Sequence, residues 1–211
     1  MTRRQTGVGL TETMLALALG LMLLAAASQV FGSAYQAWRL QGTTARMQDD
    51  ARLVLQRMAE DIRMAGMFGC LRLEPEDFRV SDAAQAFANP IQITPGNITL
   101  VGAALPGLPG PSDWTVLGDC SSWAHVMGGQ HVPAGDLFAL PVRRLVYQLR
   151  DGSLLLLTKS QNARLIDNVR ALELSRVGQR VDIRLILYDR QHQLEQQHQI
   201  SVAVRNPQGD A

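Results

Sequence analysis

The sequence predicts an α+β chain in which one long N-terminal helix packs on an antiparallel β-sheet domain. Three observations predict this fold class. From Thr13 to Ala37 the chain of 211 residues carries no charged side chain. Beyond this stretch apolar residues recur with helical spacing as far as Ala65, and after Leu145 they alternate with polar residues as strands do. The helix is therefore expected to be apolar in its first half and amphipathic in its second.

The apolar segment that follows Glu12 is long enough to cross a membrane, because about 20 mostly apolar residues suffice for a spanning helix. Arg3 and Arg4 precede it, and basic residues flanking a span stay on the cytoplasmic side. We therefore expect the N-terminus inside and everything after about residue 35 outside. Glu12 lies at the edge of this segment, where an ionised group is costly and usually functional.

The second half of the predicted helix has one apolar face and one charged face. The apolar face comprises Met47, Ala51, Val54, Leu55, Met58, Ile62 and Ala65. The charged residues expected on the opposite face are Arg46, Asp49, Asp50, Arg52, Arg57, Glu60, Asp61 and Arg63. No proline occurs before Pro75, and Gly66 and Gly69 offer a stop. One helix is expected from about Leu10 to Met64.

The remaining chain, residues 67–211, is long enough for one domain with its own core. Its first half is expected to be rich in loops, with a turn-dense connector at residues 102–111. Its second half is expected to form antiparallel strands in a curved sheet. Asp151 and Gly152 form a strong signal for a two-residue hairpin turn between segments 145–150 and 153–158. Two later alternating segments, 181–187 and 200–204, should be strands, with the polar residues 189–199 between them as a hairpin end.

Cys70 and Cys120 are the only cysteines, and in an exported chain such a pair is best interpreted as a disulfide. The bridge would close a loop of about 50 residues and contribute about 4 kcal/mol in the chain-entropy model. Two free buried thiols remain the alternative. A metal site is disfavoured because neither cysteine belongs to a C-x-x-C pair and the nearest histidine, His125, is alone.

The leader, with Gly7 five residues before Glu12, resembles the class III signal of type IV prepilins and type II secretion pseudopilins. The resemblance implies that a prepilin peptidase cuts after Gly7 and that the new terminus, Val8, is N-methylated. The first mature residue is usually Phe in that family, and here it is Val. Glu12 would be the fifth mature residue and the assembly residue, whose carboxylate pairs with the terminal ammonium of a neighbouring subunit.

The resemblance divides the chain into four parts. Residues 1–7 are the cleaved leader, and residues 8–34 are the transmembrane or fibre-core half of the helix. Residues 35–66 are its amphipathic periplasmic half, and residues 67–211 are a globular pilin-like domain rich in β-strands. The protein would reside in a bacterial inner membrane with a periplasmic domain, and then in a pilus fibre at the cell surface.

The run from Met58 to Cys70, which ends in Phe68-Gly69-Cys70, looks like the end of the stem helix in PilW-type minor pilins. Asp119-Cys120-Ser121 and the segments 165–174 and 202–206 also resemble that group. The resemblance implies a subunit that joins other minor pilins and the major pilin, through the inner-membrane assembly machinery, to initiate the fibre near its tip. A J-type pseudopilin of type II secretion shares the leader and the acidic stem end, and is the alternative.

A conventional secretory signal is a further alternative, because cleavage after Ala27 in Ala25-Ala26-Ala27-Ser28 would release a secreted binding module. A plain single-span anchor is the third possibility. Against cleavage after Ala27, an ordinary signal rarely places a glutamate before its apolar core, and the helical pattern here continues past this point.

No sequence motif indicates an enzyme or a cofactor site, since G-x-S-x-G, the Walker glycine loop and H-E-x-x-H are missing from the sequence. The four histidines, His125, His131, His192 and His198, are dispersed in polar or loop segments. Removing Arg3 and Arg4 from the 20 basic residues leaves 18 against 19 acidic ones, a net charge of −1. Arg143, Arg144 and Arg150 make only a small basic cluster, so nucleic-acid binding is not expected.

Overall fold

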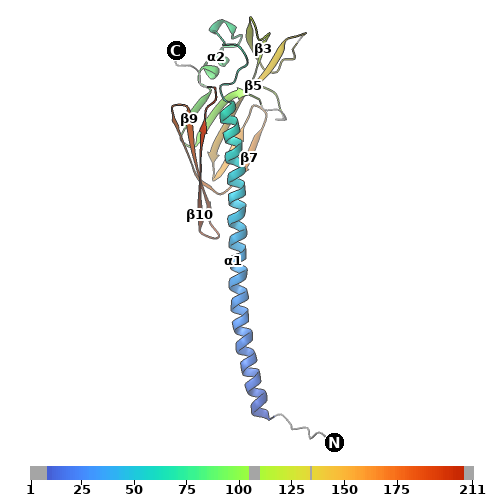
Figure 1. The fold of residues 1–211 in the computed structure, drawn as a ribbon, viewed down its shortest axis with the longest axis vertical. Coiled ribbons are helices and arrows are strands. Elements are labelled where there is room, and N and C mark those ends of the chain that lie inside the picture. Colours follow the sequence, from blue (N-terminus) through green and yellow to red (C-terminus); the bar gives the residue numbers. More distant parts are fainter. Residues whose placement is uncertain (1–8, 105–109, 134, 207–211) are drawn as a thin grey trace. The chain divides into compact units, whose positions relative to one another are not determined.

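The computed structural model describes residues 9–104, 110–133 and 135–206. Within these ranges the chain is α+β, with a long N-terminal apolar helix and antiparallel sheets (Figure 1). The helix α1 extends from Leu10 to Met64, which confirms the predicted bounds. The chain divides into two compact units, one ending at Arg46 and the other beginning at Met47.

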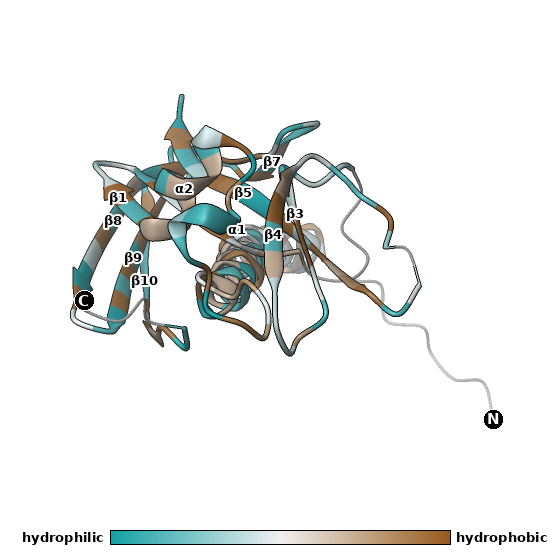
Figure 2. Ribbon diagram, turned by 90° about the horizontal axis from the view of Figure 1, so that it is seen from above, coloured by the Kyte–Doolittle hydropathy of each residue, from teal (hydrophilic) through white to brown (hydrophobic). Residues whose placement is uncertain are grey.

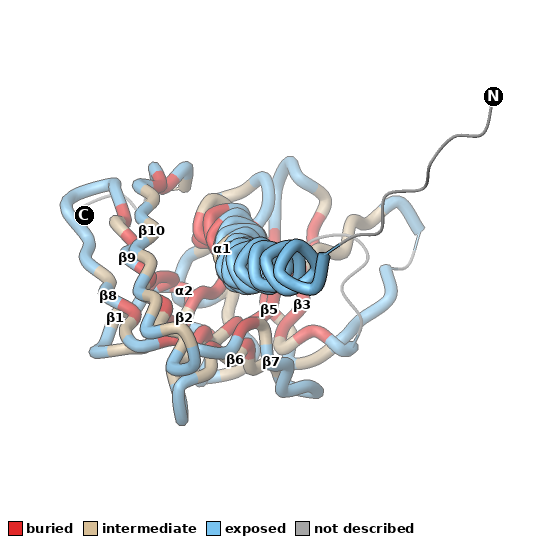
Figure 3. The backbone as a smooth tube through the Cα atoms, turned by 90° about the horizontal axis from the view of Figure 1, so that it is seen from below, coloured by how far each residue is buried: buried red, intermediate tan, exposed pale blue. Residues whose placement is uncertain are grey.

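The first unit consists of the apolar part of α1. Every described residue from Gly9 to Gly42 is exposed, as the pale blue part of α1 in Figure 3 shows. Within the first unit, therefore, no other described residues cover these apolar side chains.

In the described residues of the second unit, the structure has the amphipathic part of α1, one 3-10 turn, a short helix and ten strands. The turn η1 covers Pro75–Asp77 and α2 covers Ser81–Ala88. The strands are β1 (Ile91–Thr94), β2 (Asn97–Ala103), β3 (Trp114–Gly118), β4 (Ala124–Gly128), β5 (Phe138–Arg150), β6 (Ser153–Leu157), β7 (Asn162–Ile166), β8 (Val169–Val177), β9 (Arg180–Asp189) and β10 (Leu194–Ala203).

Strand β5 organises the larger sheet of seven strands. Val142 of β5 pairs with Ala103 of β2 and with Trp114 of β3, so these two strands lie on opposite edges of β5. Val146 pairs with β2 and with Leu157 of β6, which places β6 after β3 on the same edge. The extension of β5 to 13 residues lets one strand support three neighbours.

The expectation of one curved sheet is wrong, because β8, β9 and β10 form a second, three-stranded antiparallel sheet. Within the segment 165–174 the chain turns at Asp167 and Asn168, and Asn168 has a φ of 61°. This turn ends β7 in one sheet and begins β8 in the other. Bands of apolar and polar residues alternate along β9 (Figure 2), as the sequence predicts for a half-buried strand.

The expectation of a loop-rich first half is also wrong, because α2 and β1 to β4 lie there. Strands β1, β3 and β4 have only four or five residues, too few for a clear alternation. The polar stretch 189–199 is mostly strand as well, since Leu194 pairs with Asp189 and the turn is confined to residues 190–193. Gln196 and His198 occupy half-buried positions of β10, where the sequence pattern suggested a solvated turn.

The hairpin between β5 and β6 is confirmed. Arg150 pairs with Ser153, so Asp151 and Gly152 form a two-residue turn. Their φ values of 52° and 75° are both positive, as the turn that matches strand twist requires.

Two apolar clusters stabilise the second unit. The larger cluster contains the buried face of α1, including Met47, Ala51, Val54, Met58 and Ile62, and apolar side chains of both sheets. All seven residues predicted for the apolar face of α1 are buried. The smaller cluster combines aliphatic and aromatic side chains, and its Phe68 and Phe87 rings are stacked with their centroids 4.1 Å apart.

Candidate functional site: the exposed apolar part of the N-terminal helix

The predicted processing site, Gly7 and Val8, lies outside the described residues. Glu12 lies in the first turn of α1 and is exposed. Its backbone N–H donates to the carbonyl of Gly9, with an N–O distance of 3.0 Å. A carboxylate in the first helical turn interacts favourably with the helix dipole, so Glu12 is compatible with the start of α1.

The surface that follows Glu12 is apolar on every side of the helix. Leu21, Met22, Leu23 and Leu24 occupy four successive positions and are each more than 60 % exposed. Four successive residues point in different directions around a 3.6-residue turn, so this surface is a full cylinder and not a stripe. A helix that is apolar all round is typical of a membrane span or of a segment buried among other apolar elements. Among the described residues, α1 is the one helix that is long and apolar enough to cross a membrane.

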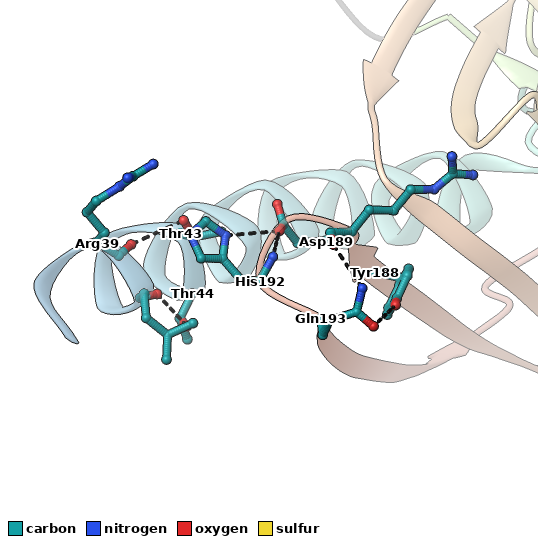
Figure 4. Close-up of polar contacts among 9 residues, drawn as sticks. Arg39, Thr43, Thr44, Tyr188, Asp189, His192 and Gln193 are labelled. Atoms are coloured by element: carbon teal, nitrogen blue, oxygen red, sulfur yellow. Dashed lines mark hydrogen bonds and ion pairs between the residues drawn. The ribbon is translucent and has the colours of Figure 1, made fainter. Parts of the chain in front are cut away.

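The serine and threonine hydroxyl groups that follow Glu12 in this cylinder are satisfied within the helix. Thr13 donates to the carbonyl of Leu10 at 2.8 Å, Ser28 to Leu24 at 2.9 Å and Ser33 to Val30 at 2.9 Å. Thr43 and Thr44 form the same kind of bond with Arg39 and Leu40 further along α1 (Figure 4). An unpaired hydroxyl is costly in hydrocarbon, so these internal bonds make the cylinder suited to an apolar environment.

A buried polar cluster joins the other end of α1 to β5. The hydroxyl of Tyr147 donates to Asp61 Oδ2, and Arg57 Nε donates to the same oxygen at 3.1 Å. Asp61 is 3 % exposed and Tyr147 is completely buried. Burial raises the pKa of the Asp61 carboxyl, because desolvation disfavours its charged form, and burial likewise raises the pKa of Tyr147.

The prediction that Asp61 lies on the solvent face of α1 is wrong. Asp61 follows Val54 by seven residues, about two helical turns, and therefore shares its apolar face. The spacing could have revealed this position, as could Arg57 four residues earlier, the separation of an ion pair on a helix. The sequence predicted an exposed Asp61 because acidic side chains are mostly exposed. In the folded unit, Asp61 links α1 to β5 through its hydrogen bond with Tyr147.

The predicted disulfide is present. Cys70, just after α1, is bonded to Cys120 in the connection between β3 and β4, with the Cα atoms 5.4 Å apart. The Asp119 carboxylate beside it accepts hydrogen bonds from the backbone N–H groups of Ser121, Ser122 and Trp123. These bonds, together with one from the Ser122 hydroxyl, hold the pKa of Asp119 well below its usual range. The connection between β3 and β4 is therefore held by its own hydrogen bonds as well as by the disulfide.

The histidines are separated in the structure. His192 contacts Asp189 at 3.0 Å in the turn between β9 and β10 (Figure 4), whereas His125 is 3.9 Å from Asp77. Within the described ranges there is no group of three or more His, Cys, Asp or Glu side chains that could hold a metal ion.

Several arginines of the described ranges are engaged with other groups of the chain. Arg143 is buried and donates to the carbonyl of Gly110, while the Arg144 guanidinium lies 5.0 Å from the centre of the Trp114 ring. A surface groove of about 1050 Å³ has Arg150, Arg164, Arg170 and Arg190 in its lining. Three of these arginines are within ion-pair distance of Asp151, Asp167 and Glu195, respectively. Acidic partners therefore offset most of the positive charge of this groove.

Comparison of the chain with protein-family models, with curated proteins and with solved structures finds no significant match.

Proposed function

We propose that this chain is a minor pilin subunit of the PilW type, with a pilin-like arrangement of stem helix and β-rich domain. It joins other minor pilins and the major pilin to initiate assembly of a type IV pilus, and it sits at or near the fibre tip. The observation that carries the proposal is the placement of Glu12, five residues after Gly7, in the first turn of an apolar helix.

The apolar cylinder fits a subunit that passes between two apolar environments. Before assembly the segment crosses the inner membrane with its N-terminus in the cytoplasm, where lipid surrounds side chains such as Leu21 to Leu24. After assembly the stems of neighbouring subunits surround the same side chains. One surface satisfies both states because apolar contacts have no fixed direction.

Glu12 provides the polar contact that apolar packing lacks. Removal of the leader after Gly7 creates an ammonium group on Val8, near the start of the helix. A carboxylate from one subunit and an ammonium from the next neutralise each other where an unpaired charge would be heavily penalised. This pair therefore sets the register between subunits.

Two observations favour the PilW type over a J-type pseudopilin. The Phe68-Gly69-Cys70 stretch follows the stem, and Cys70 is disulfide-bonded.

A pseudopilin role predicts loss of protein secretion when the gene is deleted, whereas a pilus role predicts loss of surface fibres while secretion continues. Counting fibres by electron microscopy and measuring secreted enzymes in the same deletion strain separates these two functions.

The first test is the mass and N-terminal sequence of the mature protein from membranes. A chain that begins with methylated Val8 supports the prepilin class. A chain that begins at Ser28 contradicts it, because Glu12 would be removed with the signal and the remaining domain would be secreted.

A matched pair of variants sharpens this test. Gly7→Leu places a bulky residue at the proposed cleavage site, and an unprocessed, membrane-held protein is expected. Gly9→Leu makes the same change two residues later and should leave processing intact. A mature product of unchanged mass from Gly7→Leu would refute processing at this site.

A further inference from the structure

The aromatic side chains of the first unit are confined to the end of the apolar cylinder. Between Gly9 and Arg46 the aromatic residues are Phe31, Tyr35 and Trp38, and the first charge after Glu12 is Arg39. Tyr35 and Trp38 are three residues apart and therefore lie on one side of α1. Their ring centres are 6.1 Å apart, and the Arg39 guanidinium carbon is 6.0 Å from the centre of the Tyr35 ring.

This cluster of Tyr35, Trp38 and Arg39 presents apolar rings and polar tips together. Tyr35 is 59 % exposed and Trp38 is 69 % exposed. In the described part of the chain, neither the phenol O–H of Tyr35 nor the indole N–H of Trp38 has a hydrogen-bond partner. Rings of this kind concentrate at the membrane–water interface, where one end is apolar and the other is hydrated. An arginine beside them can extend its charge toward lipid phosphates.

The distance along α1 places the cluster at the depth of the headgroups. The apolar stretch from Thr13 to Phe31 is about 28 Å long at 1.5 Å per residue, close to the hydrocarbon thickness of about 30 Å. From Glu12 to Arg39 the helix extends about 40 Å, which corresponds to a bilayer including its headgroup regions. With Glu12 at the inner edge of the membrane, the cluster therefore reaches the outer headgroups.

We propose that Tyr35, Trp38 and Arg39 form an interfacial anchor that binds the phospholipid headgroups of the outer leaflet. The anchor sets the depth of α1 before assembly and thereby holds Glu12 at the inner edge. The positive charge of Arg39 complements the lipid phosphates, which distinguishes this occupant from the apolar stem of another subunit. The inference rests on the membrane-held state contained in the proposed function.

The test measures the depth of Trp38 in a bilayer. The processed full chain is placed in phosphatidylcholine vesicles whose acyl chains carry bromine either near the headgroup or near the bilayer centre. The difference in fluorescence between the wild type and Trp38→Phe isolates Trp38 from Trp114 and Trp123 without altering the folded domain. We expect bromine near the headgroup to quench this Trp38 fluorescence more strongly than bromine near the bilayer centre does.

A control variant reports insertion independently of the anchor. Leu21→Trp in the Trp38→Phe background places the indole near the middle of the span, and stronger quenching by deep bromines is expected. Arg39→Leu removes the charge beside Trp38, and we expect Trp38 to move toward the deep quencher.

Each contrary outcome has a distinct meaning. If bromine near the bilayer centre is the stronger quencher of both the control tryptophan and Trp38, then Trp38 lies in hydrocarbon and the anchor is refuted. If the control is quenched and Trp38 is not quenched by either lipid, the cluster lies outside the membrane and the anchor is again refuted. If the control itself is not quenched, the chain does not span the bilayer, which contradicts both the anchor and the membrane-held state of the proposed function.

Discussion

Two acidic residues of α1 occupy opposite environments. Glu12 is exposed in the first turn, whereas Asp61 is buried against β5 and bonded to Tyr147 and Arg57. A buried carboxylate requires partners within the chain, whereas an exposed one is solvated by water and needs an outside partner only when an apolar environment surrounds its helix. Glu12 is therefore a candidate for assembly, and Asp61 for stability of the folded unit.

Glu12→Ala should leave cleavage after Gly7 intact and reduce incorporation into fibres by about a hundredfold, because loss of a desolvated ion pair costs about 3 kcal/mol. The measurement is the amount of the subunit in sheared fibres relative to its amount in membranes. Thr11→Ala, one residue away, is the control and should incorporate normally. Unchanged incorporation of Glu12→Ala would remove the ion-pair role.

Tyr147→Phe should lower the free energy of unfolding by about 1–3 kcal/mol, since the buried Asp61 carboxylate loses a hydrogen-bond donor. Denaturation of the full chain in detergent, followed by fluorescence of the buried Trp114, measures this change. Tyr188→Phe is the matched control, because its hydroxyl bonds to Gln193 on the surface (Figure 4). Equal stability of the two variants would contradict a stabilising role for the buried cluster.

The Asp61 carboxyl should also make stability depend on pH. Burial raises its pKa in the folded state above the ordinary value of 3.8, so the folded chain retains the proton to higher pH than the unfolded chain. The associated stability is complete below the unfolded pKa and is lost as the pH rises through the folded pKa.

Between these two values, the wild type should lose stability relative to Asp61→Asn as the pH rises. Denaturation of both proteins over a pH series measures the difference. Asp49→Asn, exposed on the same helix, should show no such trend. A wild-type advantage that grows with pH would show that the carboxylate is the favoured buried form.

At the level of elements, the end of α1 is joined closely to β2. Ala65 forms a bridge with Gly102, and the N–H of Gly66 donates to the carbonyl of Val101 at 2.9 Å. A Cβ atom on Gly102 would lie 2.3 Å from the carbonyl oxygen of Met64, and that backbone cannot move aside as a flexible side chain could. The approach of helix and strand therefore depends on the missing side chain.

Gly102→Ala should destabilise the second unit by about 1–3 kcal/mol through this overlap. The control is Gly178→Ala, where the added carbon meets open space and only the positive φ of 58° opposes the change. Such backbone strain costs about 1 kcal/mol. Thermal unfolding measured by circular dichroism compares the two variants. A larger effect at Gly178 would contradict a close contact between α1 and β2.

The disulfide between Cys70 and Cys120 stabilises the element junction after α1. Cys120→Ser should lower the free energy of unfolding by about 2–4 kcal/mol, because the unfolded chain gains freedom in a long loop. Ser121→Ala, the adjacent residue, is the control. Reduction of the wild type should reproduce the variant, and a reduced protein of full stability would contradict this contribution.

At the level of the whole molecule, the described apolar cores lie entirely in the second unit, whereas the exposed apolar cylinder lies in the first. A chain that begins at Met47 should therefore stay in solution without detergent and retain its disulfide when produced in an oxidising compartment. Size-exclusion chromatography and thiol titration measure both properties. Aggregation of this fragment would show that residues before Met47 are needed for the second unit to fold.

Local chemistry made several features predictable from the sequence. The bounds of α1 follow from apolar spacing and from Gly66, and the turn between β5 and β6 follows from Asp151 and Gly152. These signals act within a few residues, where the sequence is directly informative. The processing role of Gly7 and Val8 and the assembly role of Glu12 stay predictions, since they depend on partners outside the chain.

By itself, the sequence determined the long helix, its apolar and amphipathic parts and the strand alternation of β9, and it favoured a disulfide between the two cysteines. Only the tertiary structure decided that the strands divide between two sheets, that residues 81–128 form a helix and short strands, and that Asp61 is buried. The physical reason is distance along the chain. The Tyr147 hydroxyl that donates to Asp61 comes from β5, which is far from Asp61 in the sequence. Short strands such as β3 become stable only through neighbouring strands, and local periodicity does not specify those neighbours.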